Sequence, residues 1–225
     1  MLLAPALANA DLLVVQKVES GNPVRSAEIT LKIKGDKMRA DVSPEISTIT
    51  DTATGETITL RHGPKTYLRL DARATQALLG KLEKTRKERE ARGEGEETAK
   101  LEATGKRESV GGYDTRIYTA QVGELKMTYW IAQNLPSADK LLSVSAQLQK
   151  SAMVKLAKGM MPLPEDFALP GFPVKTEMAT PDGRKITTTV ISIKEQPLDD
   201  LDFTVPLNYY ALPEPSFVPD PAPTP

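Results

Sequence analysis

The stretch from Ser26 to Asp71 constrains the fold most, because apolar and polar residues alternate along it in several short runs. A period of two is the pattern of β-strands with one buried face. The alternating apolar positions are Ile29, Leu31, Ile33, Met38, Ala40, Val42, Ile58, Leu60, Leu68 and Leu70. Residues that favour tight turns separate the runs, namely Gly35-Asp36, Thr54-Gly55 and His62-Gly63-Pro64. The sequence therefore predicts an antiparallel meander with one apolar face turned inward.

The composition limits the class of protein. The 225 residues are 40% hydrophobic and 26% charged, which is typical of a globular domain. The 29 basic and 30 acidic residues nearly cancel, so no overall field attracts nucleic acid, and we expect no nucleic-acid partner. The chain has no cysteine, which excludes disulfides, thiolate metal sites and a lipidated cysteine.

The first ten residues carry a signal for export. They form a short apolar piece that ends in Ala8-Asn9-Ala10, the small-x-small pattern of a signal-peptidase site. We interpret residues 1–10 as a signal-peptide remnant and expect the mature chain to begin at Asp11, in a periplasmic or secreted protein. A disordered alanine-rich terminus is the alternative. No other run approaches the roughly 20 apolar residues of a membrane-spanning helix, so we expect no transmembrane segment.

Further strands are expected on both sides of the meander. In chain order they are Asp11–Ser20, Leu101–Ser109, Tyr113–Ala120, Leu125–Ala132, Val174–Met178, Lys185–Glu195 and a last extended piece at Asp200–Pro206. Gly111-Gly112 and Pro181-Asp182-Gly183 are the expected hairpin turns. Strands of this kind predict a mainly antiparallel sheet.

Two helices are predicted between the strands. Asp71 is placed as the N-cap of the first, whose apolar positions are Ala72, Ala74, Leu78, Leu79 and Leu82. The second is expected from Ser137 to Lys158, with a stripe of Ala138, Leu141, Leu142, Ser145, Leu148, Ala152, Met153 and Leu156. This stripe suits either static packing on a concave sheet or a movable lid.

The domain organisation follows from charge and proline content. Residues 11–210 are expected to form a single domain, within which residues 81–100 lose apolar positions and basic residues give way to acidic ones. We expect that charged segment to be a mobile, solvated helix end and loop, with docking of a protein partner as the alternative. Residues 211–225 are too rich in proline to fold and are expected to be a disordered tail.

No catalytic or metal-binding motif is present in the sequence. The single histidine, His62, is expected in a solvent-exposed turn, where it suits neither a catalytic triad nor a metal cluster. Asp199-Asp200-Leu201-Asp202 resembles part of a calcium site but lacks the glycine and glutamate of an EF-hand loop, so we expect it to be solvated. We therefore expect a non-catalytic protein with no cofactor and no metal.

Several motifs resemble a known group of proteins. Gly112–Tyr118, Thr128–Ala132 and Leu201–Pro206 are similar to segments of an uncharacterised family of secreted bacterial proteins with the lipoprotein-carrier fold of LolA, LolB and LppX. The resemblance implies an α+β fold in which a strongly curved antiparallel half-barrel sheet wraps around two or more helices. It also implies a concave apolar cavity that takes acyl chains.

Together these observations predict a protein that binds or carries an apolar ligand, such as a lipid or lipoprotein acyl chains, on the concave face of the sheet. The residues expected to contact that ligand are Leu31, Ile33, Met38, Met127, Tyr129, Leu142, Leu148, Met153, Met160 and Phe172. The alternative is a structural or protein-interaction module whose core is filled and binds no ligand.

Overall fold

The structure is a computed structural model of the chain that describes residues 11–21, 23–92, 100–132, 134–135, 138, 141–143, 146, 169–180 and 182–213. Its elements are β1 (Leu12–Ser20), β2 (Arg25–Lys34), β3 (Lys37–Ser43), β4 (Ile46–Asp51), β5 (Thr57–Arg61), β6 (Thr66–Leu70), α1 (Ala72–Ala91), β7 (Glu102–Val110), β8 (Tyr113–Val122), β9 (Leu125–Ala132), β10 (Phe172–Ala179), β11 (Lys185–Glu195), the 3₁₀ helix η1 (Asp200–Phe203) and β12 (Tyr210–Ala211).

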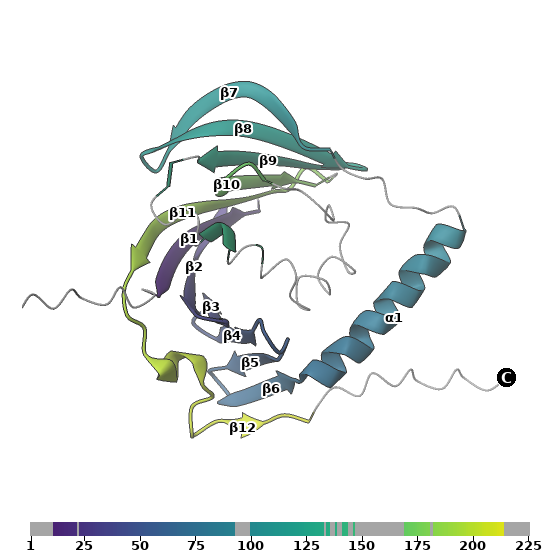
Figure 1. Cartoon of the computed structure of the whole chain (residues 1–225), viewed down its shortest axis with the longest axis vertical. Helices are drawn as coiled ribbons and strands as arrows, with labels where there is room; N and C mark the ends of the chain where they lie inside the picture. Colours follow the sequence, from purple (N-terminus) through teal and green to yellow (C-terminus); the bar gives the residue numbers. More distant parts are fainter. Residues whose placement is uncertain are drawn as a thin grey trace, which may run out of the picture.

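These strands form one 12-stranded sheet with the order β12-β6-β5-β4-β3-β2-β1-β11-β10-β9-β8-β7. β1 lies in the middle, where it pairs antiparallel with both β2 and β11. The short β12 pairs in parallel with β6, whereas the other pairs are antiparallel. Figure 1 shows the sheet curving strongly, with its β7 and β12 edges apart and α1 on the open side. The predicted curved, mainly antiparallel sheet is confirmed.

The turn between β7 and β8 fixes the register of the exposed edge of the sheet. Val110 pairs with Tyr113, so Gly111 and Gly112 alone make the turn. Both glycines have positive φ angles, of 59° and 83°. A two-residue turn of this type needs positive φ at both positions, which glycine adopts without a steric cost. The hairpin predicted at this position is confirmed.

The meander contains β4, a strand that the alternation in the sequence did not single out. β4 pairs with β3 and β5, and Ile49 lies between Arg39 on one side and Ile58 on the other. Met38 is on the opposite face of β3 from Arg39, because successive side chains of a strand alternate. Ile58 and Leu60 therefore face away from the side on which Met38 lies. The prediction of one inward apolar face for the whole meander is wrong.

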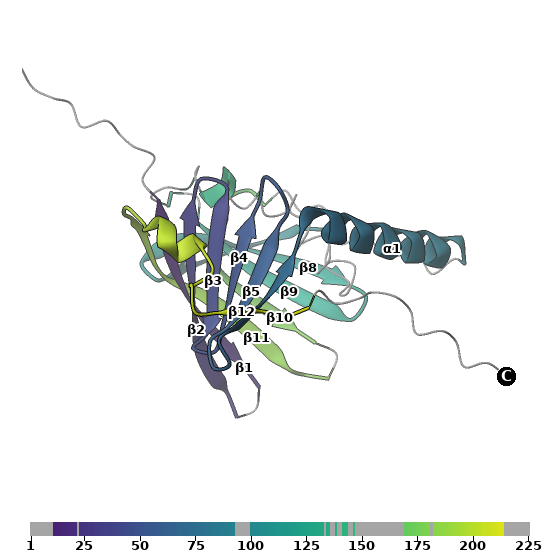
Figure 2. The same ribbon diagram turned by 90° about the horizontal axis from the view of Figure 1, so that it is seen from below.

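The outer face of the meander has an apolar core of its own. Ile49, Ile58 and Leu60 pack there with Leu198 and Phe203, and Tyr67, Val205 and Tyr209 lie against them. Leu198, Phe203, Val205 and Tyr209 come from residues 196–212, named here the C-terminal segment, whereas Tyr67 is on β6. Figure 2 shows that η1 and the chain leading to β12 cross the outer side of the β2–β5 strands. The C-terminal segment thus covers what would otherwise be an exposed apolar surface.

Asp200–Phe203 is a 3₁₀ helix and not the extended piece that was predicted. Asp199 caps it, since its side chain accepts a hydrogen bond of 3.0 Å from the Leu201 amide. The turn places Phe203 in the outer core at 5% exposure and leaves Leu201 at 72%. Capping by aspartate and burial of one aromatic ring explain why this short helix replaces a strand.

The first helix begins as predicted. Asp71 Oδ1 accepts a hydrogen bond of 2.7 Å from the Ala74 amide, which is the N-cap geometry. The helix continues to Ala91, well into the charged segment. Pairs of opposite charge one turn apart, Lys84–Glu88 at 3.9 Å and Lys87–Glu83 at 3.1 Å, favour that extension. Residues 93–99 lie outside the described part of the chain, and the mobility of the segment stays a prediction.

The second predicted helix, 137–158, falls largely outside the described residues. Ala138, Leu141, Leu142, Ser143 and Ala146 have helical backbone. Figure 1 places the helical residues 141–143 inside the curve of the sheet. α1, in contrast, lies on the open side of the curve. A sheet wrapped around two or more helices is therefore not confirmed for the described residues.

Packing of the C-terminal segment can be tested at Phe203. We expect Phe203→Ala to lower the free energy of unfolding by about 3–5 kcal/mol, because it removes a large buried side chain from the outer core. Leu201→Ala is the matched control in the same 3₁₀ helix, and it should change stability by no more than about 0.5 kcal/mol. Chemical denaturation of both variants measures this. Equal losses in the two variants would contradict the assigned packing.

Candidate functional site

The inner face of β1–β3 is the starting point of the candidate site. In the register of these strands Leu12 lies opposite Ile33, Val14 opposite Leu31, and Ile33 opposite Met38. Partners directly across an antiparallel pair project from the same face. Leu12, Val14 and Ile33 are buried, whereas Leu31 and Met38 are half-buried. The face is therefore continuously apolar across three strands.

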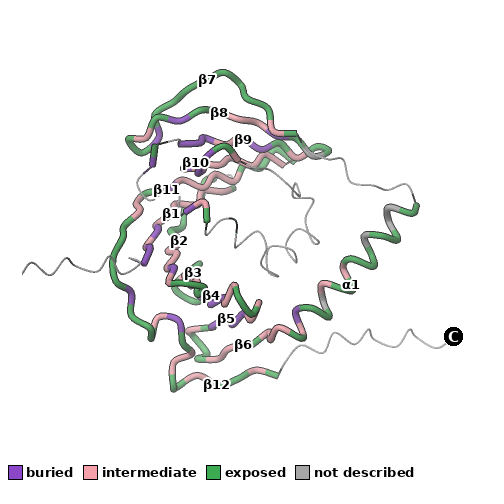
Figure 3. The backbone as a smooth tube through the Cα atoms, in the orientation of Figure 1, coloured by how far each residue is buried: buried purple, intermediate pink, exposed green. Residues whose placement is uncertain are grey.

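The apolar face extends beyond β1 into the second half of the sheet. One cluster joins Leu12, Val14 and Ile33 to Val110, Trp130, Ala132, Leu135, Leu141, Phe172, Val174 and Val190. It is named here the concave cluster, because Leu141 belongs to the helical piece inside the curve of the sheet (Figure 1). Figure 3 shows where the buried residues lie: β1, β9 and β10 contain buried residues, whereas most of β7 is exposed. The cluster thus links strands far apart in the sequence.

Part of the concave cluster is still accessible. Its half-buried members are Leu31, Met38, Tyr113, Ile117, Ala138, Leu142 and Ile193. A fully buried side chain has no surface left for a ligand, so these residues are the ones that a bound apolar group can contact. They come from both halves of the sheet and from the helical piece.

The structure brings together five of the ten residues predicted to bind ligand. Ile33 and Phe172 belong to the buried part of the concave cluster, and Leu31, Met38 and Leu142 pack against it. Leu148, Met153 and Met160 lie outside the described residues. The accessible residues that sequence reasoning missed are Tyr113, Ile117, Ala138 and Ile193. Apolar alternation was visible along the strands of Tyr113, Ile117 and Ile193, and Ala138 was in the predicted helical stripe, but nothing in the sequence shows which elements become neighbours.

Met127 and Tyr129 lie elsewhere. They pack with Ala120 and Met178 in a separate cluster, on the opposite face of β9 from Trp130. The Tyr129 hydroxyl donates to Met127 Sδ at 3.2 Å, and burial raises the pKa of Tyr129 to about 12. The two residues therefore do not join the others in one site.

The inner face changes character at β4 and β5. There the register places threonines opposite one another, Thr48 with Thr59 and Thr50 with Thr57, on the face shared with Met38. The hydroxyl groups of Thr57 and of Thr75 in α1 are buried without a hydrogen-bond partner among the described residues. A buried unpaired hydroxyl is costly, so this polar strip bounds the apolar region.

His62 is not the solvent-exposed turn residue that was expected. It is half-buried, with Nε2 2.7 Å from Ser47 Oγ and Nδ1 2.6 Å from the Tyr209 hydroxyl. Ser47 in turn donates to Asp41 at 2.5 Å and accepts from Arg39 at 3.2 Å. The solvated-turn prediction is corrected because the C-terminal segment brings Tyr209 against the turn, over a sequence separation that local reasoning does not reach.

This network contains a serine, a histidine and an aspartate, but the hydrogen bonds do not run as in a catalytic triad. A triad needs the carboxylate on the histidine and the histidine accepting the serine proton. Here Asp41 accepts the Ser47 proton, and Ser47 is 1% exposed. Arg39, Asp41, Ser47, His62 and Tyr209 therefore anchor the C-terminal segment to β3–β5.

The acidic cluster near the C-terminus is likewise structural. Lys32 pairs with Asp202 at 2.5 Å, and Lys34 pairs with Asp200 at 2.7 Å. The hydrogen bond from Lys34 is the main cause that holds the pKa of Asp200 below its ordinary value. The expectation of a solvated cluster is wrong for Asp202. Among the described residues, no three His, Asp or Glu side chains converge to hold a metal ion.

Comparison with known proteins identifies the family. A family model described as a domain of unknown function (DUF4412) matches residues 16–209. The chain belongs to the DUF4412 family. The uncharacterised family predicted from the motifs in β8, β9 and the C-terminal segment is therefore confirmed. No curated protein matches this DUF4412 sequence.

Several solved structures are similar to this DUF4412 chain. Two structures of PNGF-II are 11% identical over 90% of the chain, with TM-scores of 0.42 and 0.45, and the chain spans only 31% of those proteins. A LolA superfamily protein from Nitrosomonas europaea is 8% identical over 88% of this chain and 91% of its own length, with a TM-score of 0.35. A DUF1329 family protein from Desulfovibrio piger covers the same shares at 8% identity and a TM-score of 0.34.

These likenesses are distant and carry no information about what the chain binds. Within the described ranges, no helix combines the length and the hydropathy needed to cross a membrane.

The network predicts a pH dependence at Asp41. Burial alone raises the pKa of this carboxyl group, but hydrogen bonds from Ser47 and Arg39 outweigh it and leave the pKa below its ordinary value. The ionised Asp41 carboxylate therefore adds to the free energy of unfolding above the unfolded-state pKa of about 3.9. This stabilisation is lost as the pH falls through the lower folded-state pKa. We expect Asp41→Asn to flatten the acid limb of a plot of unfolding free energy against pH. Asp36→Asn, at an exposed turn, should keep the original slope; parallel limbs for all three proteins would refute the role of Asp41.

Proposed function

We propose that the protein binds an apolar chain, such as a lipid or the acyl chains of a lipoprotein, on the concave cluster. The observation that carries this proposal is the continuity of that cluster across β1–β3 and β9–β11, with half-buried members on an open, curved sheet. Each square ångström of apolar surface withdrawn from water contributes roughly 25 cal/mol. Contact with a hydrocarbon chain is what such a surface favours.

The distribution of polar groups supports an elongated apolar ligand. The threonine strip on β4 and β5 borders the cluster on one side. Charged side chains of the meander, such as Lys32 and Arg39, are on the outer face, where the C-terminal segment pairs with them. Apolar and charged groups are thus separated onto the two faces of β2 and β3. Where these two strands pair, the inner face therefore carries no charge that a hydrocarbon would have to desolvate.

A non-catalytic, extracytoplasmic role completes the proposal. The Ser47–His62 pair is directed to Asp41 and Tyr209 in a way that favours anchoring over nucleophilic attack. The Ala8-Asn9-Ala10 pattern supports export, which would place the protein where lipids and lipoproteins are transferred between membranes.

The second candidate is a protein-interaction module with a filled core. It is favoured by α1, which lies on the open side of the sheet (Figure 1) and whose Arg73, Lys84, Lys87 and Glu88 are exposed. In that case residues 81–100 or the proline-rich tail would contact a protein partner, and the concave cluster would only stabilise the fold.

Leu142 distinguishes the two functions. We expect the delipidated protein to bind a fluorescent fatty-acid probe, and Leu142→Glu to abolish this binding by placing a charge in an apolar site. Ile191→Glu is the control, because Ile191 is 52% exposed at the bulge between β1 and β11. It should bind the probe as the unmodified protein does. Native mass spectrometry before and after delipidation gives an independent readout.

Leu142→Ala separates a lid from static core. In a filled core we expect the substitution to cost about 2–5 kcal/mol of stability. If Leu142 instead lines a binding site, the substitution should weaken retention of the probe and cost less stability. The reason is that part of the Leu142 surface then contacts the ligand and not the protein core. A large stability loss together with no probe binding by the unmodified protein would rule out the carrier function and leave the filled module.

A further inference from the structure

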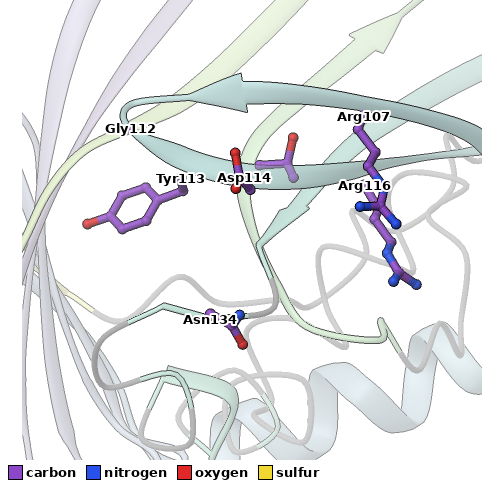
Figure 4. Close-up of a pocket in the computed structure, with 7 residues that line it drawn as sticks. Arg107, Gly112, Tyr113, Asp114, Arg116 and Asn134 are labelled. Carbon is purple, nitrogen blue, oxygen red and sulfur yellow. The ribbon is translucent and has the colours of Figure 1, made fainter.

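Two arginines face each other at the β7 edge of the sheet. Arg107 on β7 and Arg116 on β8 are direct partners in the antiparallel register, which the Gly111-Gly112 turn determines. Both are exposed, and Figure 4 shows their side chains extending in the same direction from the strand pair. Like charges directly opposite on a sheet destabilise the pair. The arrangement therefore has a cost that a bound anion would remove.

No acidic group in the described part of the chain offsets these two charges by an ion pair. Glu108, next to Arg107, points to the other face of β7, where its carboxylate accepts a hydrogen bond of 2.6 Å from Trp130 Nε1. The salt bridges of the described residues involve neither arginine. Asp114 is nearby, on the same face as Arg116, but forms no ion pair with it. Both guanidinium groups thus keep their donors for a ligand.

The arginine pair lies between two recesses. The larger has a volume of about 350 Å³ and is lined by Arg107, Tyr113, Asp114, Arg116 and Asn134, with the backbone of the hairpin (Figure 4). The smaller, of about 220 Å³, shares both arginines and adds Lys106. Around the two recesses there are three basic side chains, Lys106, Arg107 and Arg116, and one acidic side chain, Asp114. The larger recess has the volume to hold a small oxyanion and its substituent.

We propose that this site, named here the arginine pair, binds the phosphate group of a phosphate ester. A guanidinium group presents its N–H donors in a planar fork that matches phosphate oxygens in pairs. The two forks and the Asn134 amide line the larger recess, and together they supply more donors than the two oxygens of a carboxylate can accept. The three terminal oxygens of a phosphate monoester can use them. Asp114 can accept a hydrogen bond from a hydroxyl or amine next to the phosphate.

The phosphate can belong to a free metabolite or to a lipid headgroup. Assigning the phosphate to a lipid headgroup rests on the proposed function. The position of the recess supports this assignment. Tyr113 lines the recess and also packs against the concave cluster. Asn134 lines the recess and precedes Leu135 of the same cluster. The Gly111-Gly112 turn therefore brings the recess next to the concave cluster. The arginines project from the opposite face of β8 from Tyr113, so the headgroup of a bound chain would reach them over this edge of the sheet.

Isothermal titration calorimetry on the whole protein tests the site. The probes are inorganic phosphate, a lysophospholipid with a phosphoglycerol headgroup, and the monoacylglycerol with the same acyl chain. Arg107→Gln and Arg116→Gln, alone and combined, remove the positive charges. Arg25→Gln is the matched control, since it removes an exposed arginine from β2. Thermal unfolding of each variant without ligand confirms that it is folded.

We expect the unmodified protein and Arg25→Gln to bind phosphate equally. Titration with chloride at the same ionic strength should show no binding. Each single substitution at the arginine pair should weaken phosphate binding about tenfold, the loss expected when a charged hydrogen-bonding partner is removed. Arg116→Lys should recover part of the affinity, because it restores the charge without the planar fork. The monoacylglycerol should bind equally well to all variants.

The outcomes separate the two proposals. Lysophospholipid binding tighter than phosphate, and reduced in the double variant, supports a headgroup site. Phosphate binding that the acyl chain does not strengthen supports a site for a free phosphate ester. Phosphate affinity that is undetectable, or unchanged in the double variant, overturns the arginine pair, even if the monoacylglycerol binds and the apolar site stands.

Discussion

The antiparallel pairing of β1 with β11 is the interaction on which the rest of the structure depends. β1 precedes the meander and β11 is the last long strand, so this pair joins two halves that are otherwise separate in the sequence. Asp11 strengthens the junction, since its buried carboxylate accepts a hydrogen bond of 2.9 Å from the Leu198 amide. Without this pair the concave cluster would be divided into two separate surfaces.

The same sheet carries apolar cores on both faces, and this explains the role of the C-terminal segment. The outer core on β4 and β5 needs a cover, which Leu198 and Phe203 supply. Lys32 then pairs with the Asp202 carboxylate, and Arg39 donates to the Asp202 carbonyl. His62 forms a hydrogen bond with the Tyr209 hydroxyl. Because the segment satisfies both the apolar and the charged groups of the outer face, the inner face remains available for function.

The two proposed sites would suit the two ends of one amphiphile if the phosphate belongs to a lipid headgroup. The concave cluster offers contact with hydrocarbon, and the arginine pair at the β7–β8 hairpin offers donors to an oxyanion. Tyr113 belongs to both, which links them physically. β7 is also an edge strand with charged residues along it, and exposed charge on an edge disfavours pairing with another chain. Arg107 can thus both hold an anion and disfavour pairing at the β7 edge.

Local pattern in the sequence determined most of the strands. Alternation and turn glycines predicted β1, the hairpins around Gly35 and Gly111-Gly112, and the pair of β10 with β11, because these features depend on neighbouring residues. The N-cap at Asp71 was predictable for the same reason. Membership of the family was also accessible, since it rests on short motifs.

Tertiary structure decided which face of each strand became the site. Insertion of β4 set the register that turns Ile58 outward and lines the inner face with threonines, and a slip of one residue would have reversed both faces. The opposition of Arg107 and Arg116 likewise exists only through pairing. His62 and Tyr209 are 147 residues apart, and Asp11 and Leu198 are 187 apart. Periodicity carries no information over such separations, because it reports the burial of a residue's own strand and not the identity of the segment that buries it.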